Sequence, residues 1–272
     1  MLITGIDILF VALGLVGIAI GFLRRKQVPP ALAPPPSSIE EILLTAVALL
    51  VAAVGPNILV VALTPGMPTM DVLTQYALLP SVPLLVIVIV ITARLRLKRL
   101  LNRIWSGLWI GAVSTGALDV IRLTGFSLGW MPGNMPRMFG VLIFDQMALG
   151  PSDLSDVVGG FYHYWVSACF GLTYTLLIGR TRWWGGLIWG LIIEVGMMTT
   201  PPMVVAMDTG YFGLKFGFGV LGTSLAAHIV YGIVLGILLE RYTKHKRWFV
   251  PLVKEALRDW QQRSSAVRKV SL

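Results

Sequence analysis

The chain has 272 residues, of which 56% are hydrophobic and only 13% are charged, and its formal net charge is +9. This composition excludes an ordinary soluble domain, in which about 25% of residues are charged. The positive charge does not indicate nucleic-acid binding, because the Lys and Arg residues form short clusters at the ends of apolar runs, as membrane topology requires.

Apolar runs of about 20 residues recur along the chain, and each is long enough to cross roughly 30 Å of hydrocarbon as a helix. They predict an all-α polytopic membrane bundle of about seven transmembrane helices. The expected spans are residues 3–23, 39–63, 73–95, 104–124, 158–179, 184–207 and 219–240. No basic segment precedes the first run, which favours a membrane helix over a cleavable signal peptide.

The segments between the spans predict three further features. Residues 24–38 contain five prolines and predict an extended spacer, followed by a helix cap at Ser37 or Ser38 with acids in the first turn. Two prolines, Pro80 and Pro83, should disturb the start of the third span. Within the long segment 125–157, residues 140–149 are apolar but too short to span, which predicts an interfacial or re-entrant helix.

The basic residues predict the orientation, because short cytoplasmic loops are enriched in Lys and Arg. Of the 22 Lys and Arg residues, all except Arg122, Arg137 and Lys215 fall on one side of the expected bundle. We therefore expect a multi-pass protein of the inner (plasma) membrane, with its N-terminus outside and its C-terminus in the cytoplasm.

The tail, residues 241–272, is basic and has a different pattern. Apolar residues recur at helical spacing between Trp248 and Trp260, with charged residues on the other face. The apolar positions are Phe249, Val253, Ala256, Leu257 and Trp260. This pattern predicts an amphipathic helix on the inner leaflet, held there by anionic lipid. The alternative is a solvated tail.

Five ionisable residues lie inside the expected spans, where such residues usually face the bundle interior and mark function. They are Asp119, Arg122, His163, Glu194 and His228. With a rise of about 1.5 Å per residue, Asp119 and His163 lie at matching depths near the outer face, and Glu194 and His228 at matching depths near the midplane. Arg122 lies one turn beyond Asp119 and could neutralise it. The spacing predicts two acid–histidine pairs, which form either a proton or cation site or satisfied packing contacts.

Two other patterns have a structural and a functional interpretation. Met131, Met135 and Met138 have helical spacing and are copper candidates, because thioethers suit Cu(I); methionine also fills irregular apolar gaps. Small residues four apart predict close helix packing, and one such stripe could form a homodimer face. These stripes begin at Gly17, Gly107, Gly186 and Gly232.

Several activities lack the residues that they need. The single cysteine, Cys169, excludes an internal disulfide and CxxC sites. The seventh span contains no lysine for a retinal Schiff base, and no phosphate loop, zinc motif or nucleophile elbow is present. We therefore assign no catalytic residue and no cofactor.

Four short segments carry a resemblance to a known family. They are Gly160-Phe161-Tyr162-His163 with Tyr174 in the same span, Arg182-Trp183-Trp184-Gly185-Gly186-Leu187, Thr200-Pro201-Pro202-Met203, and Ala227-His228-Ile229-Val230-Tyr231-Gly232. These segments, within residues 159–240, resemble the YagU-like group of small inner-membrane proteins. The resemblance implies an inner-membrane location and an association with acid tolerance, but no catalytic residue. The chain departs from that group in its extra N-terminal spans and its basic tail.

We expect a membrane protein that binds or conducts a proton or small cation through an outward-facing polar site. The alternative is a non-catalytic accessory subunit of a larger membrane complex, which the mostly apolar inner half of the expected bundle favours over full transport. An enzyme that acts on a lipid or quinone is a third option, without a motif to support it.

Overall fold

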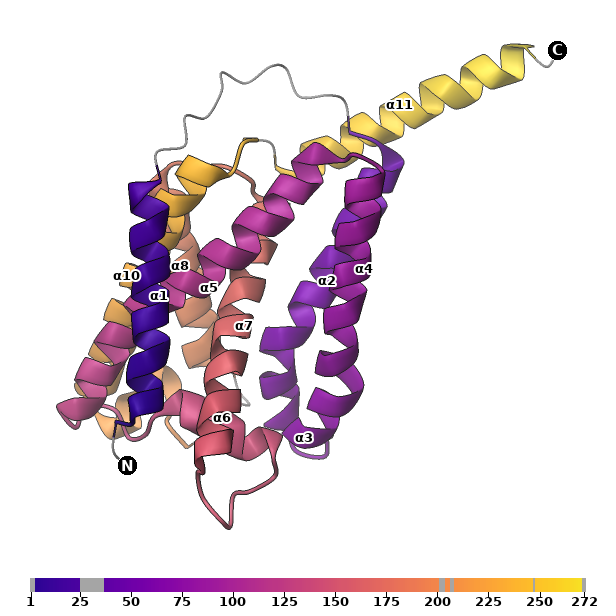
Figure 1. Cartoon of the computed structure of the whole chain (residues 1–272). Coiled ribbons are helices and arrows are strands. Elements are labelled where there is room, and N and C mark those ends of the chain that lie inside the picture. The colour runs from indigo at the N-terminus through magenta and orange to yellow at the C-terminus, as the bar shows by residue number, and fades with distance from the viewer. Residues whose placement is uncertain (1–2, 25–36, 201–203, 206–207, 247, 271–272) are drawn as a thin grey trace.

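The computed structural model describes residues 3–24, 37–200, 204–205, 208–246 and 248–270, and in this part of the chain it is an all-α bundle (Figure 1). Its elements are α1 (Gly5–Leu23), α2 (Ile39–Ala62), α3 (Met70–Leu73), the π-helical turn η1 (Thr74–Leu78), α4 (Leu79–Arg94), α5 (Lys98–Ser127), α6 (Met135–Ile143), α7 (Asp153–Leu177), α8 (Trp183–Thr199), the 3-10 segment η2 (Tyr211–Phe216), α10 (Phe218–Tyr242) and α11 (Phe249–Val270). Most of the expected proline-rich spacer lies outside the described residues.

Local sequence explains where several helices begin. Ser38 caps α2 by accepting a hydrogen bond from the Glu41 amide, as the sequence predicts. Thr4 caps α1 and Ser152 caps α7, each in a reciprocal capping box. Elements α3, η1 and α4 run on from one another, and the π-helical turn comes directly before the prolines that we expected to disturb this span, because proline has no amide donor for the regular pattern.

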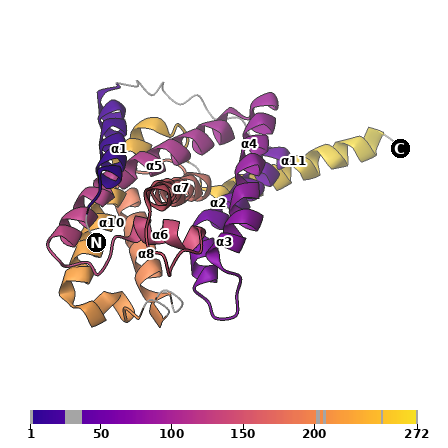
Figure 2. The same cartoon turned by 60° about the horizontal axis from the view of Figure 1, so that its bottom comes forward.

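Five helical segments in the described chain are long and apolar enough to cross a membrane: α1, α2, residues 70–94, α5 and α10. The fold is therefore that of a multi-pass helical membrane protein. The expected spans 158–179 and 184–207 correspond to α7 and α8. Helix α8 is apolar but shorter than expected, since it ends at Thr199, just before the Pro201-Pro202 of the sequence. Helix α7 is more polar because it lies at the centre of the bundle, where other helices surround it (Figure 2).

The bundle has two chemically different ends. One is the basic end, where α4 finishes at Arg94, α5 starts at Lys98 and α11 lies across the top in Figure 1. The other is the α6 end, where the short helix α6 packs against the start of α7. The interfacial helix that we expected at 140–149 is in fact α6, which begins earlier and ends at Ile143. Pro136 lies in its first turn, where a missing amide donor costs nothing.

All four small-residue stripes pack against neighbours within the chain. A Cβ atom added to Gly111 would lie 2.4 Å from the Ser167 carbonyl oxygen, which places α5 directly against α7. The Gly186 and Gly232 stripes face each other between α8 and α10, and Gly17 faces Val113. The close approach that glycine permits is thus used inside the fold at these stripes, and a homodimer stays a prediction.

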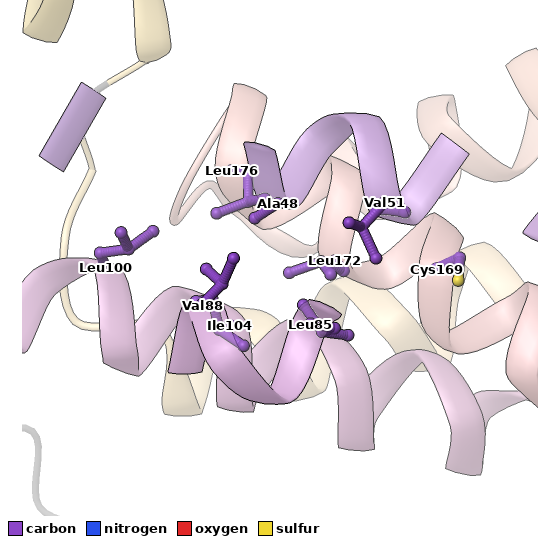
Figure 3. Packing of buried hydrophobic residues seen from close by; sticks show 10 residues of the cluster. Ala48, Val51, Leu85, Val88, Leu100, Ile104, Cys169, Leu172 and Leu176 are labelled. Carbon is purple, nitrogen blue, oxygen red and sulfur yellow. The ribbon is translucent and has the colours of Figure 1, made fainter. Parts of the chain in front are cut away.

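A dry core lies between α2, α4, α5 and α7 toward the basic end, and Figure 3 shows its interlocking side chains. Polar groups are buried beside it, contrary to the expectation of a mostly apolar inner half. Arg99 forms a two-pronged ion pair with Glu41, at 2.7 Å from Nε to Oε1 and 2.5 Å from Nη2 to Oε2. Arg103 donates from Nη1 to the Leu176 carbonyl oxygen at 3.2 Å, in the last turn of α7. The sequence pattern marks these arginines as a surface cluster, whereas both side chains are buried.

The tail forms the helix that its periodicity predicts, but its face is used differently. Leu252 and Ala256 are the buried residues, at 3% and 1% exposed, and the helix packs against α2. Ser37 Oγ donates to the Leu252 carbonyl oxygen at 2.6 Å and fixes this contact. Trp260, which we placed on the same apolar face as Ala256, is 56% exposed. The apolar arc of α11 therefore has a protein-bound part and an uncovered part.

Candidate functional site

The first acid–histidine pair joins α5 to the central helix α7. Asp119 Oδ1 lies 3.1 Å from His163 Nε2 and 2.9 Å from Arg122 Nε, so one carboxylate oxygen contacts both groups. Gly107, Gly111 and Thr115 share the helical stripe of Asp119, and their small size brings this stripe against α7. The predicted pairing of Asp119 with His163, and its neutralisation by Arg122, are both confirmed.

This pair continues into a chain of hydrogen bonds that sequence reasoning missed. Arg122 Nη1 donates to Asn134 Oδ1 at 2.7 Å, and Asn134 Nδ2 donates to Asp7 Oδ1 at 2.8 Å. Asp7 also closes the capping box of α1 through its other oxygen. A polar network therefore runs from the beginning of α1 to His163.

The second acid–histidine pair joins α8 to α10. Glu194 Oε2 lies 2.7 Å from His228 Nδ1 and accepts a hydrogen bond from Ser224 Oγ, also at 2.7 Å. Glu194 is 2% exposed, and its Oε1 has no hydrogen-bond partner in the described chain. The matched depths of Glu194 and His228 are thus confirmed as a direct contact. The Gly190 and Gly232 positions allow it, because they bring α8 and α10 within backbone contact.

The contacts of His228 settle its tautomer. Its Nδ1 lies 2.9 Å from the Ser224 carbonyl oxygen, which can only accept a hydrogen bond. Nδ1 therefore carries the proton that it donates to this carbonyl, and Glu194 Oε2 lies 2.7 Å away as the ion-pair partner of the ring. In the neutral ring this leaves Nε2 as a hydrogen-bond acceptor.

Both imidazoles line one cavity of about 390 Å³. Its walls come from α2, α5, α6, α7, α8 and α10, and they are mainly apolar and aromatic. The polar side chains among its lining residues include Arg122, His163, Ser167, Ser224 and His228. The cavity ends near Phe170 and Tyr231, beyond which the fully buried Tyr174 and Leu235 fill the bundle toward the basic end.

A much smaller void lies on the other side of His163. Its volume is about 10 Å³, and its walls include Asp7, Asp119 and Asp156. A void of this size is close to the lower limit for one water molecule, and three carboxylates supply hydrogen-bond acceptors for it. His163 thus separates a polar, acid-lined void from the apolar cavity.

The methionines that we considered as copper ligands do not form a separate cluster with histidine or cysteine. Met131 and Met135 line the large cavity, whereas Met138 is not among its lining residues. Within the described residues, no group of three His, Cys, Asp or Glu side chains has the arrangement to hold a metal ion. A copper site formed by thioethers stays a prediction.

Comparison with protein-family models, with curated proteins and with solved structures found no match for this chain. The resemblance of residues 159–240 to the YagU-like group therefore stays a prediction. Two of the segments that carry it supply His163 and His228, the two histidines that line the cavity.

Proposed function

We propose that the protein is a seven-span inner-membrane protein that binds protons at two acid–histidine pairs inside the bilayer. The observation that carries this proposal is that His163 and His228, each held by a buried carboxylate, face the same cavity. A carboxylate partner orients an imidazole and stabilises its protonated form. Two such pairs in one cavity offer two places where a proton can reside inside the membrane.

The proposed orientation has the basic end in the cytoplasm and the α6 end outside. Arg94, Arg96 and Lys98 lie together at the basic end, and Arg182 and Arg241 flank the helices that begin or finish there. Cytoplasmic loops have this excess of positive charge. In this orientation the network from Asp7 to His163 begins at the outer face, and the cavity is an outward-facing site.

The proposal is for proton binding rather than passage across the whole membrane. The cavity ends in the middle of the bundle, and Tyr174 and Leu235 fill the space beyond it. The buried ion pair of Glu41 and Arg99 at the basic end is already satisfied. This closed half supports the second candidate function, a non-catalytic accessory subunit that contributes its bundle to a larger complex.

Proton uptake tests the proposal directly, because the chain contains only three histidines. The purified protein, reconstituted in lipid nanodiscs, is moved from neutral to mildly acidic pH, and the protons taken up are counted with an indicator dye. The variants Asp119→Asn and Glu194→Gln should each take up fewer protons than the natural protein, because each removes the carboxylate that holds an imidazole. Asp145→Asn is the matched control, because it is the same kind of change at an exposed acid that lines neither the cavity nor the small void.

Nitrogen-15 spectra of the same three histidines supply the second measurement. His228 should show the tautomer with the proton on Nδ1, and acidification should change the signals of His163 and His228. Signals from both cavity histidines that do not respond to pH would contradict proton binding and favour the accessory-subunit role.

We also propose that the uncovered face of α11 rests on anionic lipid of the inner leaflet. Val250, Leu257 and Trp260 are 60%, 47% and 56% exposed, and basic side chains follow along the same helix. Interfacial helices combine such an apolar arc with positive charge. The double variant Leu257→Ser with Trp260→Ser should release α11 from lipid, seen as faster hydrogen exchange over residues 257–270 in anionic nanodiscs. Equal exchange in both proteins would contradict this contact.

A further inference from the structure

The large cavity has a sideways mouth between α2 and α8. Asn57 on α2 and Ile192 and Met197 on α8 line the cavity, yet Ile192 is 55% and Met197 37% exposed. Figure 2 shows α2 and α8 on different sides of α7. Both helices have apolar outer surfaces, so this mouth faces the hydrocarbon of the bilayer. A ligand that reaches the cavity this way must be soluble in lipid.

The charges on the cavity wall balance, which indicates a neutral ligand. Arg122 is paired with Asp119 at 2.9 Å, so neither presents a free charge. Glu194 is not among the residues that line the cavity, and its carboxylate is paired with His228 at 2.7 Å. A lipophilic cation would find no uncompensated carboxylate on the cavity wall, and a fatty-acid anion would find no free guanidinium there.

The hydrogen-bonding groups on the wall indicate oxygen atoms on that ligand. Trp189 lines the cavity, and its Nε1 is buried without a hydrogen-bond acceptor in the described chain. This atom is covered by protein, so a ligand oxygen would reach it only after the indole turns toward the cavity; the contact would then satisfy the donor, since unpaired buried donors are costly. The neutral His228 ring supplies the complementary group, because Nε2 accepts hydrogen bonds. The wall therefore suits both a carbonyl oxygen and a hydroxyl group.

The remaining wall favours a flat ring. Five aromatic side chains line the cavity: Phe139, Tyr162, Phe170, Trp189 and Tyr231. The volume of about 390 Å³ lies within the range of small-molecule sites, about 300–1,000 Å³. It accepts a ring head with part of a tail, but not the two chains and headgroup of a phospholipid.

We propose that this cavity binds a neutral, lipid-soluble ring compound of the quinone and quinol class, which enters between α2 and α8. The ring lies among the aromatic side chains, its oxygens meet the His163 and His228 imidazoles and the Trp189 indole, and its tail leaves through the mouth. This inference rests on the proposed function, because the imidazoles that bind protons are the ones that contact the ligand oxygens.

The test uses a glycine at the mouth of the cavity and a matched glycine elsewhere. Gly196 lines the cavity, and a Cβ atom added there meets no other atom within 4 Å. Among the described residues there is thus room for the first atom of the added side chain, and the remaining atoms of Gly196→Leu would narrow the mouth. Gly222 on α10 is equally unhindered but does not line the cavity, so Gly222→Leu is the control.

The full-length protein in phosphatidylcholine nanodiscs is titrated with decylubiquinone. Binding is monitored at each step by the nitrogen-15 spectra of the three histidines. The signals of His163 and His228 should shift, and that of His245 should not. Gly196→Leu should weaken binding at least about tenfold, because the side chain occupies the ligand's path. Gly222→Leu should bind like the natural protein, and Trp189→Phe should bind more weakly because it removes the indole donor.

Comparison ligands decide whether the site recognises the ring. Decanol has a similar tail without the ring, and tetraphenylphosphonium is a lipophilic cation. Equal binding of either compound at the two cavity histidines would overturn the quinone assignment. If His163 and His228 respond to pH but not to decylubiquinone, the ligand inference fails and proton binding stands. If they respond to neither, both proposals fail.

Discussion

Removing one partner of the Glu194–His228 pair should be far more costly than neutralising the other. The Glu194 carboxylate is almost completely buried, and within the described part of the chain its Oε2 contacts His228 Nδ1 as an ion pair and Ser224 Oγ through a hydrogen bond. His228→Ala removes the ion-pair partner, and a buried ionisable group left without its partner destabilises a protein by about 3–5 kcal/mol. With Ser224 still in place, we expect the lower end of this range, about 3 kcal/mol.

Glu194→Gln should cost about 1 kcal/mol, because glutamine keeps the shape and can still accept the hydrogen bond from Ser224 Oγ. In the double variant no carboxylate is left behind, so the loss should be about 2 kcal/mol, below the sum of the single losses. The assay is unfolding of the purified protein in mixed micelles with an increasing fraction of denaturing detergent, and His245→Ala is the control. Equal and additive losses from the two single variants would refute a coupled pair.

Three further predictions concern topology, packing and pH. Leu149→Cys should react with a membrane-impermeant maleimide in intact cells, whereas Trp248→Cys should react only after permeabilisation. The two side chains are exposed at opposite ends of the bundle, and the natural cysteine is buried. The reverse labelling pattern would show that the orientation in the membrane is inverted. Gly171→Ala should destabilise the bundle by about 1–3 kcal/mol, because its Cβ atom would lie 2.3 Å from a carbonyl oxygen of α5. A loss of stability below about 0.5 kcal/mol would contradict this close packing of α7 against α5. Burial, and then the nearby guanidinium of Arg99, lower the pKa of His245 below its usual value, so the unfolded chain binds this proton more readily. Stability should therefore fall as the pH drops below about 6.5, and His245→Asn should show a smaller fall in the same unfolding assay.

The acid–histidine pairs could be predicted because helix geometry converts residue number into depth. A rise of about 1.5 Å per residue places Glu194 and His228 at one level once the ends of their helices are known. Apolar runs supply those ends within a few residues, since hydrocarbon thickness fixes the length of a span. The same reasoning located Asp119 and His163, and both contacts are present in the structure.

The partners Asn134 and Asp7 could not be predicted in this way. They lie 127 residues apart, and their contact depends on how the loop before α6 folds over the start of α1. The Thr4 and Asp7 spacing indicates a helix cap, and nothing in it points to a distant amide. Charge patterns likewise report the end of the bundle at which a residue lies, but not the direction of its side chain. Arg99 therefore marks the basic end correctly and is nevertheless buried against Glu41.

The tail shows a related limit of periodic patterns. Helical spacing predicts that the residues of one arc share a face, but not what covers each part of that face. Leu252 and Ala256 are covered by α2, whereas Trp260 is uncovered, because the helix extends past the edge of the bundle (Figure 1). The positions of α2 and α7, both of which α11 contacts, decide where the protein-covered part ends.

The contact between Arg103 and the last turn of α7 has a mechanical consequence. Arg103 is buried on α5, and its guanidinium holds the Leu176 carbonyl oxygen, while Thr175 Oγ1 donates back to the Arg103 carbonyl oxygen at 2.9 Å. The central helix is thus fastened at its C-terminal end, and the half that carries His163 borders two voids. At its other end α7 is held by α6, where Arg137 forms an ion pair with Asp156 at 2.9 Å, so His163 lies on a stretch of helix that is fastened on both sides.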